Sequence, residues 1–208
     1  MKDQDQEKFV TVSVSGSVDA VAEVISRIFG ATVNPDALEA ADADGNFLSK
    51  FDVECRYNYT DEDGNILYRV TRLKNKKSGT MSFTTEVARP DGRFRYGGIE
   101  RKVPYNLPKL REAAKNGGEV AVCNGERAVE AYNAKHEKSG IIATTFYGGL
   151  RRANRKYASF FSGVSKVYIV DNGEDPTGFL SPIDDFIKSL KGRGIAVEYV
   201  SESEAGVE

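Results

Sequence analysis

Apolar and polar residues alternate along residues 51–73 and again along residues 80–97, with an interruption in the middle of each stretch. A period of two is typical of strands with one buried face. The interruptions are Asp63-Gly64 and Arg89-Pro-Asp-Gly92, which are turn sequences because Gly accepts a positive φ and Pro presets φ. The pattern therefore predicts two β-hairpins that form a small antiparallel sheet.

After Pro108 the period changes, and segments with helical spacing alternate with short apolar runs. Helices are expected at residues 109–116, 126–136, 153–161 and 182–191, and strands at residues 119–123, 141–145, 166–170 and 195–200. Strands that alternate with helices in this way favour a parallel sheet with helices on both faces.

The beginning of the chain adds a further element. Residues 9–14 alternate as a strand does, and residues 18–29 have helical spacing after the capping residue Ser17. The predicted fold class is α+β, with a small antiparallel β subdomain followed by an α/β domain whose sheet is mainly parallel. The expected divisions are a strand-helix element with a connector (1–50), the antiparallel subdomain (51–105), the α/β domain (106–201) and a frayed acidic tail (202–208).

Composition narrows the class of protein. The longest apolar stretches have the length of strands and the N-terminus is polar, so we expect no membrane span, no signal peptide and a cytoplasmic location. Cys55 and Cys123 lack metal-ligand spacing, which excludes a four-ligand zinc site made by this chain, and both are expected to be reduced core residues. The single histidine, His136, is expected at a helix end on the surface.

Charge is distributed unevenly along the chain. Residues 1–65 carry 5 Lys+Arg against 14 Asp+Glu, whereas residues 66–110 carry 11 against 3. In this basic segment cations alternate with aromatic residues, a combination suited to phosphate contact and base stacking. The solvated face of a twisted hairpin would give the same pattern. The candidate nucleic-acid-binding residues of the segment are Arg69, Arg72, Arg101 and Lys102.

Three turns follow predicted parallel strands, and in an open α/β sheet such positions carry the function. The turns begin at Asn124-Gly125, Gly148-Gly149 and Asp171-Asn-Gly173. Glycine lets the backbone turn sharply beside a ligand, although each turn taken alone could be ordinary turn chemistry. The second turn is followed by further candidates for phosphate contact, which are Arg151, Arg152 and Arg155.

Together these turns resemble the primase-type Toprim family of bacterial, phage and plasmid primases. Its members run strand, E-G-E-K/x-D-A, helix, then strand and a Gly-Gly turn, then a strand ending in D-x-D-x-x-G. Here the motifs stand as Asn124-Gly-Glu-Arg-Ala128, Gly148-Gly149 and Asp171-Asn-Gly-Glu-Asp-Pro-Thr-Gly178. Residues 57–70 and 98–110 are similar to the segments that precede the domain in the family, so the resemblance covers about residues 51–200.

The resemblance implies a Mg²⁺-dependent phosphoryl-transfer site. In the family a glutamate after the first strand serves as general acid/base or ligand, and two aspartates after the third strand hold the metal. In this chain the catalytic candidates are Asn124, at the glutamate position, and Glu126, and an amide cannot take a proton near neutral pH. The candidate metal ligands are Asp171 and Asp175, although a direct alignment from Asp171 places Gly173 at the second position. Mg²⁺ binding is therefore expected to be weak or absent.

These observations predict a nucleic-acid-binding, Toprim/primase-like protein of a replication or mobile-element system, with weakened or lost phosphoryl-transfer activity. The expected partner is single-stranded DNA or RNA, a replication protein is a further candidate, and no membrane partner is expected. Two alternatives stay open. One is an active Mg²⁺-dependent primase or nuclease, and the other is a non-catalytic structural or regulatory subunit that acts through a protein partner.

Overall fold

The computed structural model describes residues 51–92, 94–96, 98–171 and 181–205. The predicted strand 9–14 and helix 18–29 lie outside the described residues. The chain divides into two compact units, of which one comprises Met1–Val53 with Leu73–Ser82 and the other Glu54–Arg72 with Phe83–Glu208. The second unit, the larger, therefore contains the parallel sheet together with most of the antiparallel sheet.

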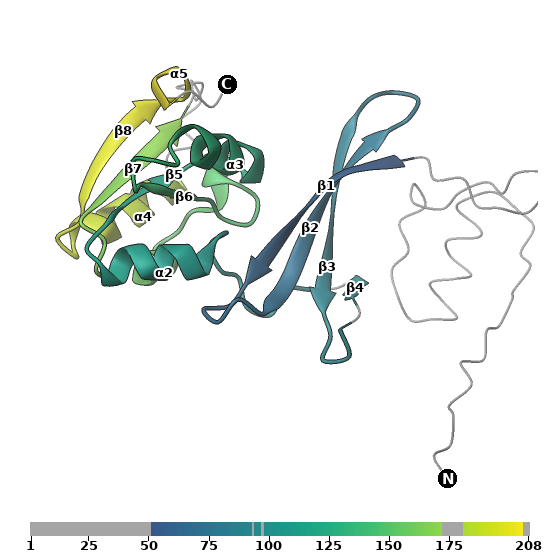
Figure 1. The fold of residues 1–208 in the computed structure, drawn as a ribbon, viewed down its shortest axis with the longest axis horizontal. Helices are drawn as coiled ribbons and strands as arrows, with labels where there is room; N and C mark the ends of the chain where they lie inside the picture. Colours follow the sequence, from purple (N-terminus) through teal and green to yellow (C-terminus); the bar gives the residue numbers. More distant parts are fainter. Residues whose placement is uncertain (1–50, 93, 97, 172–180, 206–208) are drawn as a thin grey trace, which may run out of the picture. The chain divides into compact units, whose positions relative to one another are not determined.

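The antiparallel sheet has the order β1-β2-β3-β4 (Figure 1). Its strands are β1 (Phe51–Thr60), β2 (Ile66–Asn75), β3 (Met81–Ala88) and β4 (Phe94–Tyr96). In the first hairpin turn the Asp61 carboxylate accepts the backbone N–H groups of Asp63 and Asn65, at 3.0 and 2.8 Å. In the second turn Gly92 has a φ of 78° and donates its N–H to the Arg89 carbonyl at 3.0 Å. Both predicted hairpins are confirmed.

The second sheet has the order β6-β5-β7-β8, and every described pair of neighbours is parallel. Its strands are β5 (Glu119–Val122), β6 (Ile142–Thr144), β7 (Lys166–Asp171) and β8 (Ala196–Ser201). The predicted fold class is thus confirmed: the protein is α+β, with an antiparallel sheet followed along the chain by a parallel one.

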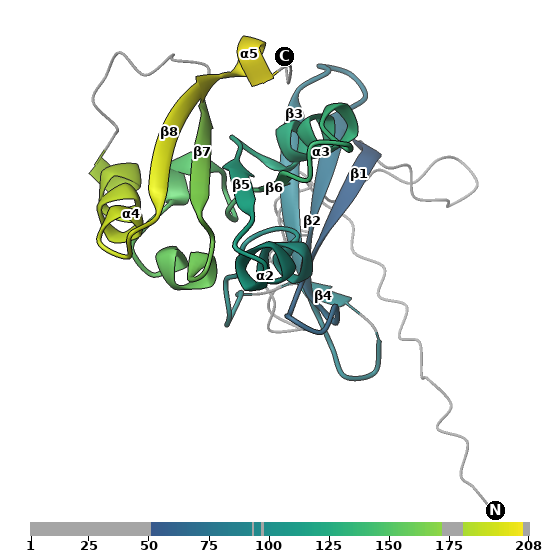
Figure 2. The ribbon, with the colours of Figure 1, turned by 60° about the vertical axis from the view of Figure 1, so that its left-hand side comes forward.

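Helices cover both faces of the parallel sheet. They are α2 (Leu107–Lys115), α3 (Glu126–Lys135), α4 (Ser181–Lys191) and α5 (Glu202–Ala205), with two 3₁₀ helices, η2 (Leu150–Arg152) and η3 (Tyr157–Phe161). In the sheet, β6 lies on one side of β5, whereas β7 and then β8 lie on the other side. Since such crossovers are right-handed, α3 lies on one face, and η2, η3 and α4 pack together on the other (Figure 2).

Two segments differ from the sequence-based expectation. The helix predicted at residues 153–161 is broken, because Ala153 is extended, with a ψ of 139°, and the Asn154 side chain accepts the Lys156 N–H at 3.0 Å. At the C-terminus, residues 202–205 form α5 in place of the start of a frayed tail. Ala205 is buried, and its carbonyl lies 2.9 Å from Nε2 of His136, which is half-buried at the end of α3.

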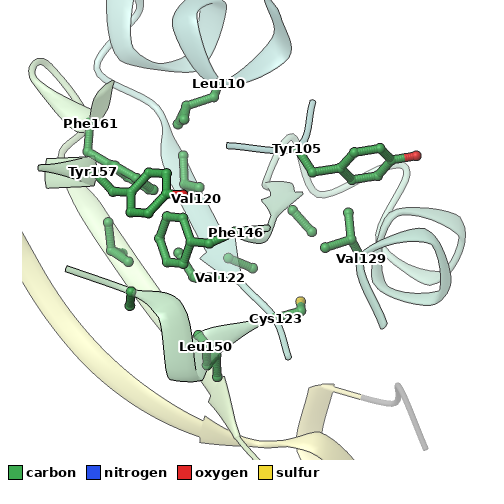
Figure 3. Packing of buried hydrophobic residues seen from close by; sticks show 14 of the residues in the cluster. Tyr105, Leu110, Val120, Val122, Cys123, Val129, Phe146, Leu150, Tyr157 and Phe161 are labelled. Atoms are coloured by element: carbon green, nitrogen blue, oxygen red, sulfur yellow. The ribbon is translucent and has the colours of Figure 1, made fainter. Parts of the chain in front are cut away.

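Aromatic side chains dominate the core of the parallel-sheet region. The Phe146 ring lies 4.4 Å from the Tyr157 ring and 5.1 Å from the Phe186 ring, centroid to centroid. Figure 3 shows the rings of Phe146, Tyr157 and Phe161 gathered on one side of β5, with Val129 of α3 on the other side. Because large aromatic side chains bury much apolar area, this cluster fixes η3 and α4 against the sheet.

The packing of η3 on α2 can be tested at Gly163. A Cβ atom at this residue, whose φ is 102°, would lie 2.3 Å from the Ala114 carbonyl oxygen in α2. Gly194 is the matched control, since its φ is 77° and a Cβ there would meet nothing within 4 Å. Either alanine substitution costs about 1–2 kcal/mol for the positive φ, and Gly163→Ala adds about 1–3 kcal/mol for overpacking.

The measurement is urea unfolding of both variants, and we expect Gly163→Ala to lose clearly more free energy of unfolding than Gly194→Ala. Equal losses would contradict the close approach of η3 to α2.

Candidate functional site

Asn124 and Asp171 stand at the carboxyl ends of two neighbouring parallel strands, β5 and β7. Val122 pairs with Ile169 in the parallel register, and the two site residues each follow their paired residue by two positions. The helices that follow β5 and β7 along the chain, α3 and α4, lie on opposite faces of the sheet, and open α/β sheets form their ligand crevice at such a switch point. The side chain of Asp171 and the whole of Asp175 lie outside the described residues.

The first and second sequence motifs contact each other at this edge. Oδ1 of the exposed Asn124 accepts the Leu150 N–H at a long 3.4 Å, and a Cβ atom at Gly149 would lie 2.8 Å from the same oxygen. Gly149 also has a positive φ of 77°. The Gly125 N–H donates to Oγ1 of Thr145 at 3.1 Å. Any side chain at position 149 would thus collide with the Asn124 side chain, which is a steric reason for glycine at this position.

Glu126, the second catalytic candidate, is engaged inside the protein. It is the first residue of α3, is 9% exposed, and accepts a 2.6 Å hydrogen bond from the Tyr59 hydroxyl in β1. Burial, reinforced by the Glu126 carboxylate, raises the pKa of Tyr59 well above its ordinary value. The phenol therefore stays protonated and keeps donating. This bond commits one Glu126 oxygen to holding the start of α3 against the antiparallel sheet.

The described side chains alone do not fit a Mg²⁺ site. Within the described ranges no three His, Cys, Asp or Glu side chains gather closely enough to hold a metal ion. Asn124 offers a neutral amide oxygen, and Glu126 is bonded to Tyr59. Mg²⁺ prefers octahedral oxygen ligands that include carboxylates. The carboxylates of Asp171 and Asp175 therefore stay the candidate ligands.

Two of the predicted nucleic-acid-binding arginines are engaged within the antiparallel sheet. Arg69 contacts both oxygens of Glu86, at 2.6 and 3.1 Å, and its guanidinium lies 3.8 Å from the centroid of the Phe94 ring. Arg72 Nε lies 3.0 Å from a Glu54 oxygen, although its N–H is directed at no acceptor among the described residues. Their positive charges are thus largely balanced by carboxylates on neighbouring strands.

The adjacent residues Arg101 and Lys102 differ in their surroundings. Nη2 of Arg101 donates to both Glu62 oxygens, at 2.6 and 2.8 Å, and these bonds hold the pKa of Glu62 below its ordinary value. Because the Arg101 side chain is 48% exposed, salt screens this pair. Lys102 Nζ lies 5.3 Å from the Tyr147 ring centroid, and Tyr147 shares a 3.1 Å hydrogen bond with Thr85.

Cationic and aromatic residues meet in a groove, called here the Lys156 groove. One hollow of about 400 Å³ is lined by Ile99, Glu100, Lys102, Asn154, Lys156, Tyr157 and Phe160. A second, of about 330 Å³, shares Asn154 and Lys156 with the first and adds Arg155 and Asp185. The two hollows are therefore adjacent, and the exposed Arg151 and Arg152 precede them directly in the chain.

The lining residues differ in how far they can be predicted from the sequence. Arg155 and Lys156 stand in one basic run, so the sequence predicts phosphate contact for both. Phe160 carries no such signal, because an aromatic residue in a segment with helical spacing is expected in the core. In the structure only Tyr157–Phe161 of that segment is helical, and Phe160 lies half-buried in the hollow that Lys156 also lines.

No helix in the described part of the chain is long and apolar enough to cross a membrane.

No model of a known protein family matches the chain, and no curated protein sequence matches it. Among solved structures, the chain is similar to the crystal structure of a DNA primase domain from Pseudomonas aeruginosa, with 16% sequence identity and a TM-score of 0.48. That similarity covers 80% of this chain and 49% of the primase-domain chain, so this chain spans about half the length of the structure that it matches.

Proposed function

We propose that the protein binds single-stranded DNA or RNA through the Lys156 groove, as a Toprim/primase-like protein whose Mg²⁺-dependent phosphoryl transfer is weakened or lost. The observation that carries this proposal is the presence of Lys102 and Lys156 in one hollow with the half-buried ring of Phe160, next to a hollow that Arg155 lines. A replication or mobile-element system is the proposed context, and a replication protein is the proposed protein partner.

The chemistry of the groove suits an unpaired strand. Cations neutralise phosphates and release counterions, and aromatic rings stack on bases whatever their sequence. Stacking requires an exposed base face, which a single strand offers and a duplex does not. The exposed Arg151 and Arg152 extend the positive surface toward the strand edge at Asn124.

The proposed loss of catalysis rests on two side chains at the strand edge. Asn124 has an amide where a proton acceptor is needed, and an amide does not take a proton near neutral pH. Glu126 could supply a carboxylate, but its hydrogen bond with the buried Tyr59 holds it within the protein. Both features favour binding without turnover.

The cations of the groove can be tested by a double substitution. Arg155→Ala with Lys156→Ala removes two phosphate contacts, so the slope of log affinity against log salt should fall by about 1.4 for a single strand. The control is Lys135→Ala with Lys138→Ala, which removes two exposed cations near the end of α3. The measurement is fluorescence anisotropy of a labelled thymidine oligonucleotide at several salt concentrations. Equal effects of the two double variants would show that binding has no defined site.

Base stacking is tested separately at Phe160. Phe160→Leu keeps an apolar side chain and removes the ring, so affinity for the same oligonucleotide should fall by about 1–3 kcal/mol if one base stacks there. The salt slope should stay unchanged, because no charge is altered. An unchanged affinity would rule out stacking at this residue.

The strand edge is tested by restoring the missing acid. Asn124→Glu adds a carboxylate beside Asp171, whereas Asn124→Gln has the same length without the charge. We expect Mg²⁺ to raise the thermal stability of the glutamate variant, since a ligand that binds the native state stabilises it. Any Mg²⁺-dependent primer synthesis or nicking should rise by about 10²–10⁴, the usual contribution of general acid-base catalysis.

The thermal shift should disappear when Asp171→Ala is added to Asn124→Glu. If glutamine and glutamate behave alike, the neutral residue at position 124 does not explain a loss of metal binding or activity.

A further inference from the structure

A second hollow lies on the antiparallel sheet and has a different character from the Lys156 groove. It has a volume of about 460 Å³, and aliphatic residues of two strands and of the following segment line it, among them Ile66, Val87 and Ile99. Ile66 is 38% exposed, which is high for so apolar a side chain. The volume falls within the range of about 300–1,000 Å³ that is usual for ligand pockets.

Three arginines and one glutamate surround this aliphatic floor, so the lining is net positive. Arg89 and Arg95 are exposed, and Arg101 is half-exposed. Arg89 Nε lies 3.8 Å from an Asp91 oxygen, a loose pair between two exposed side chains. Glu100 is the single acid of the lining. The hollow, called here the arginine-rimmed hollow, therefore combines an apolar floor with an anion-attracting rim.

A contact within the protein shows that an arginine of this rim binds a carboxylate. Arg101 binds the carboxylate of Glu62 with two short hydrogen bonds, of 2.6 and 2.8 Å. Glu62 belongs to the acidic β1–β2 turn, where the neighbouring Asp61 carboxylate is taken up by backbone N–H groups of the turn. One arginine of the rim thus already holds a carboxylate that a short acidic segment presents.

Arg101 and Lys102 divide the surface between the two hollows. Arg101 lines the arginine-rimmed hollow and Lys102 lines the Lys156 groove, and the two hollows share only Ile99 and Glu100 among their lining residues. The other nine described lining residues of the arginine-rimmed hollow, Arg101 among them, do not line the Lys156 groove. This separation leaves the arginine-rimmed hollow available for a ligand other than the strand in the groove.

We propose that the arginine-rimmed hollow binds an acidic peptide segment of a partner protein, with an apolar side chain on the aliphatic floor and carboxylates on Arg89 and Arg95. The floor decides against a nucleic acid. Among the described lining residues the single aromatic one, Tyr68, is 1% exposed and presents no ring face on which a base could stack. An aliphatic floor instead suits an aliphatic or aromatic side chain, and the rim suits its acidic neighbours. This proposal goes beyond the nucleic-acid binding proposed above.

The test uses the full chain and a short fluorescein-labelled peptide of alternating Asp and Leu residues. Two comparison peptides separate the contributions, because alternating Asp and Ser removes the apolar anchors and alternating Asn and Leu removes the charge. We expect anisotropy to rise with the Asp-Leu peptide and to rise much less with either comparison peptide. No binding of the Asp-Leu peptide, or equal binding of all three, would overturn the proposal.

Substitutions then assign the site. Arg95→Ala should weaken binding of the Asp-Leu peptide by about fivefold, as expected for an exposed ion pair, and Ile66→Ser should weaken it several-fold. Lys156→Ala is the control, since it alters the groove and should leave peptide affinity unchanged. Both tested residues are exposed, so the variants should fold, and thermal unfolding checks this.

A competition experiment separates the two proposals. An unlabelled thymidine oligonucleotide should leave the bound peptide in place, and its own affinity should depend on Lys156 and not on Ile66. If Arg95→Ala and Ile66→Ser weaken oligonucleotide binding and leave peptide binding unchanged, the hollow belongs to the nucleic-acid surface and the peptide proposal is wrong. Failure of the Lys156 groove to bind DNA would leave the peptide result unaffected.

Discussion

The hydrogen bond between Tyr59 and Glu126 holds the start of α3, beside the strand edge at Asn124, against the antiparallel sheet. It joins β1 to the first residue of α3, across 67 positions of sequence, and both partners are buried. The Tyr59 ring is stacked 4.6 Å from Tyr68 and lies 5.3 Å from Tyr105, so the bond forms inside an aromatic cluster. Burying a carboxylate without a hydrogen-bond partner costs free energy of folding. The burial of Glu126 therefore depends on the Tyr59 hydroxyl. The turn at Asn124 immediately precedes this anchored helix start, and its position follows from the bond.

The basic segment illustrates how folding redistributes charge. Along the sequence, the acidic residues 1–65 and the basic residues 66–110 are separate blocks. In the structure, Glu54 faces Arg72 and Glu62 binds Arg101, so acids of β1 and its turn balance cations of the following segment. In the described part of the basic segment, less unbalanced positive charge is therefore left than the sequence suggests.

The strand edge combines features that suit an anionic ligand with a neutral amide at position 124. The switch point, the glycine turn and the exposed cations next to it are the features that an anionic substrate requires. The amide of Asn124 keeps a hydrogen-bonding group there without its charge. The proposed phosphate binding is compatible with this amide, because phosphate recognition uses cations and N–H donors that need no titratable acid.

The sequence by itself determined the local features of this protein. The two hairpins follow from a period of two with glycine at positive φ, and the alternation of helices and strands fixes a parallel sheet with right-handed crossovers. Tertiary structure alone decided which distant residues meet: the register that pairs β5 with β7, the partner of Glu126, and the half-buried position of Phe160 beside Lys156. The physical reason is one of range. Turn geometry and burial periodicity depend on neighbouring residues, whereas ion pairs, buried hydrogen bonds and grooves depend on how separate elements pack.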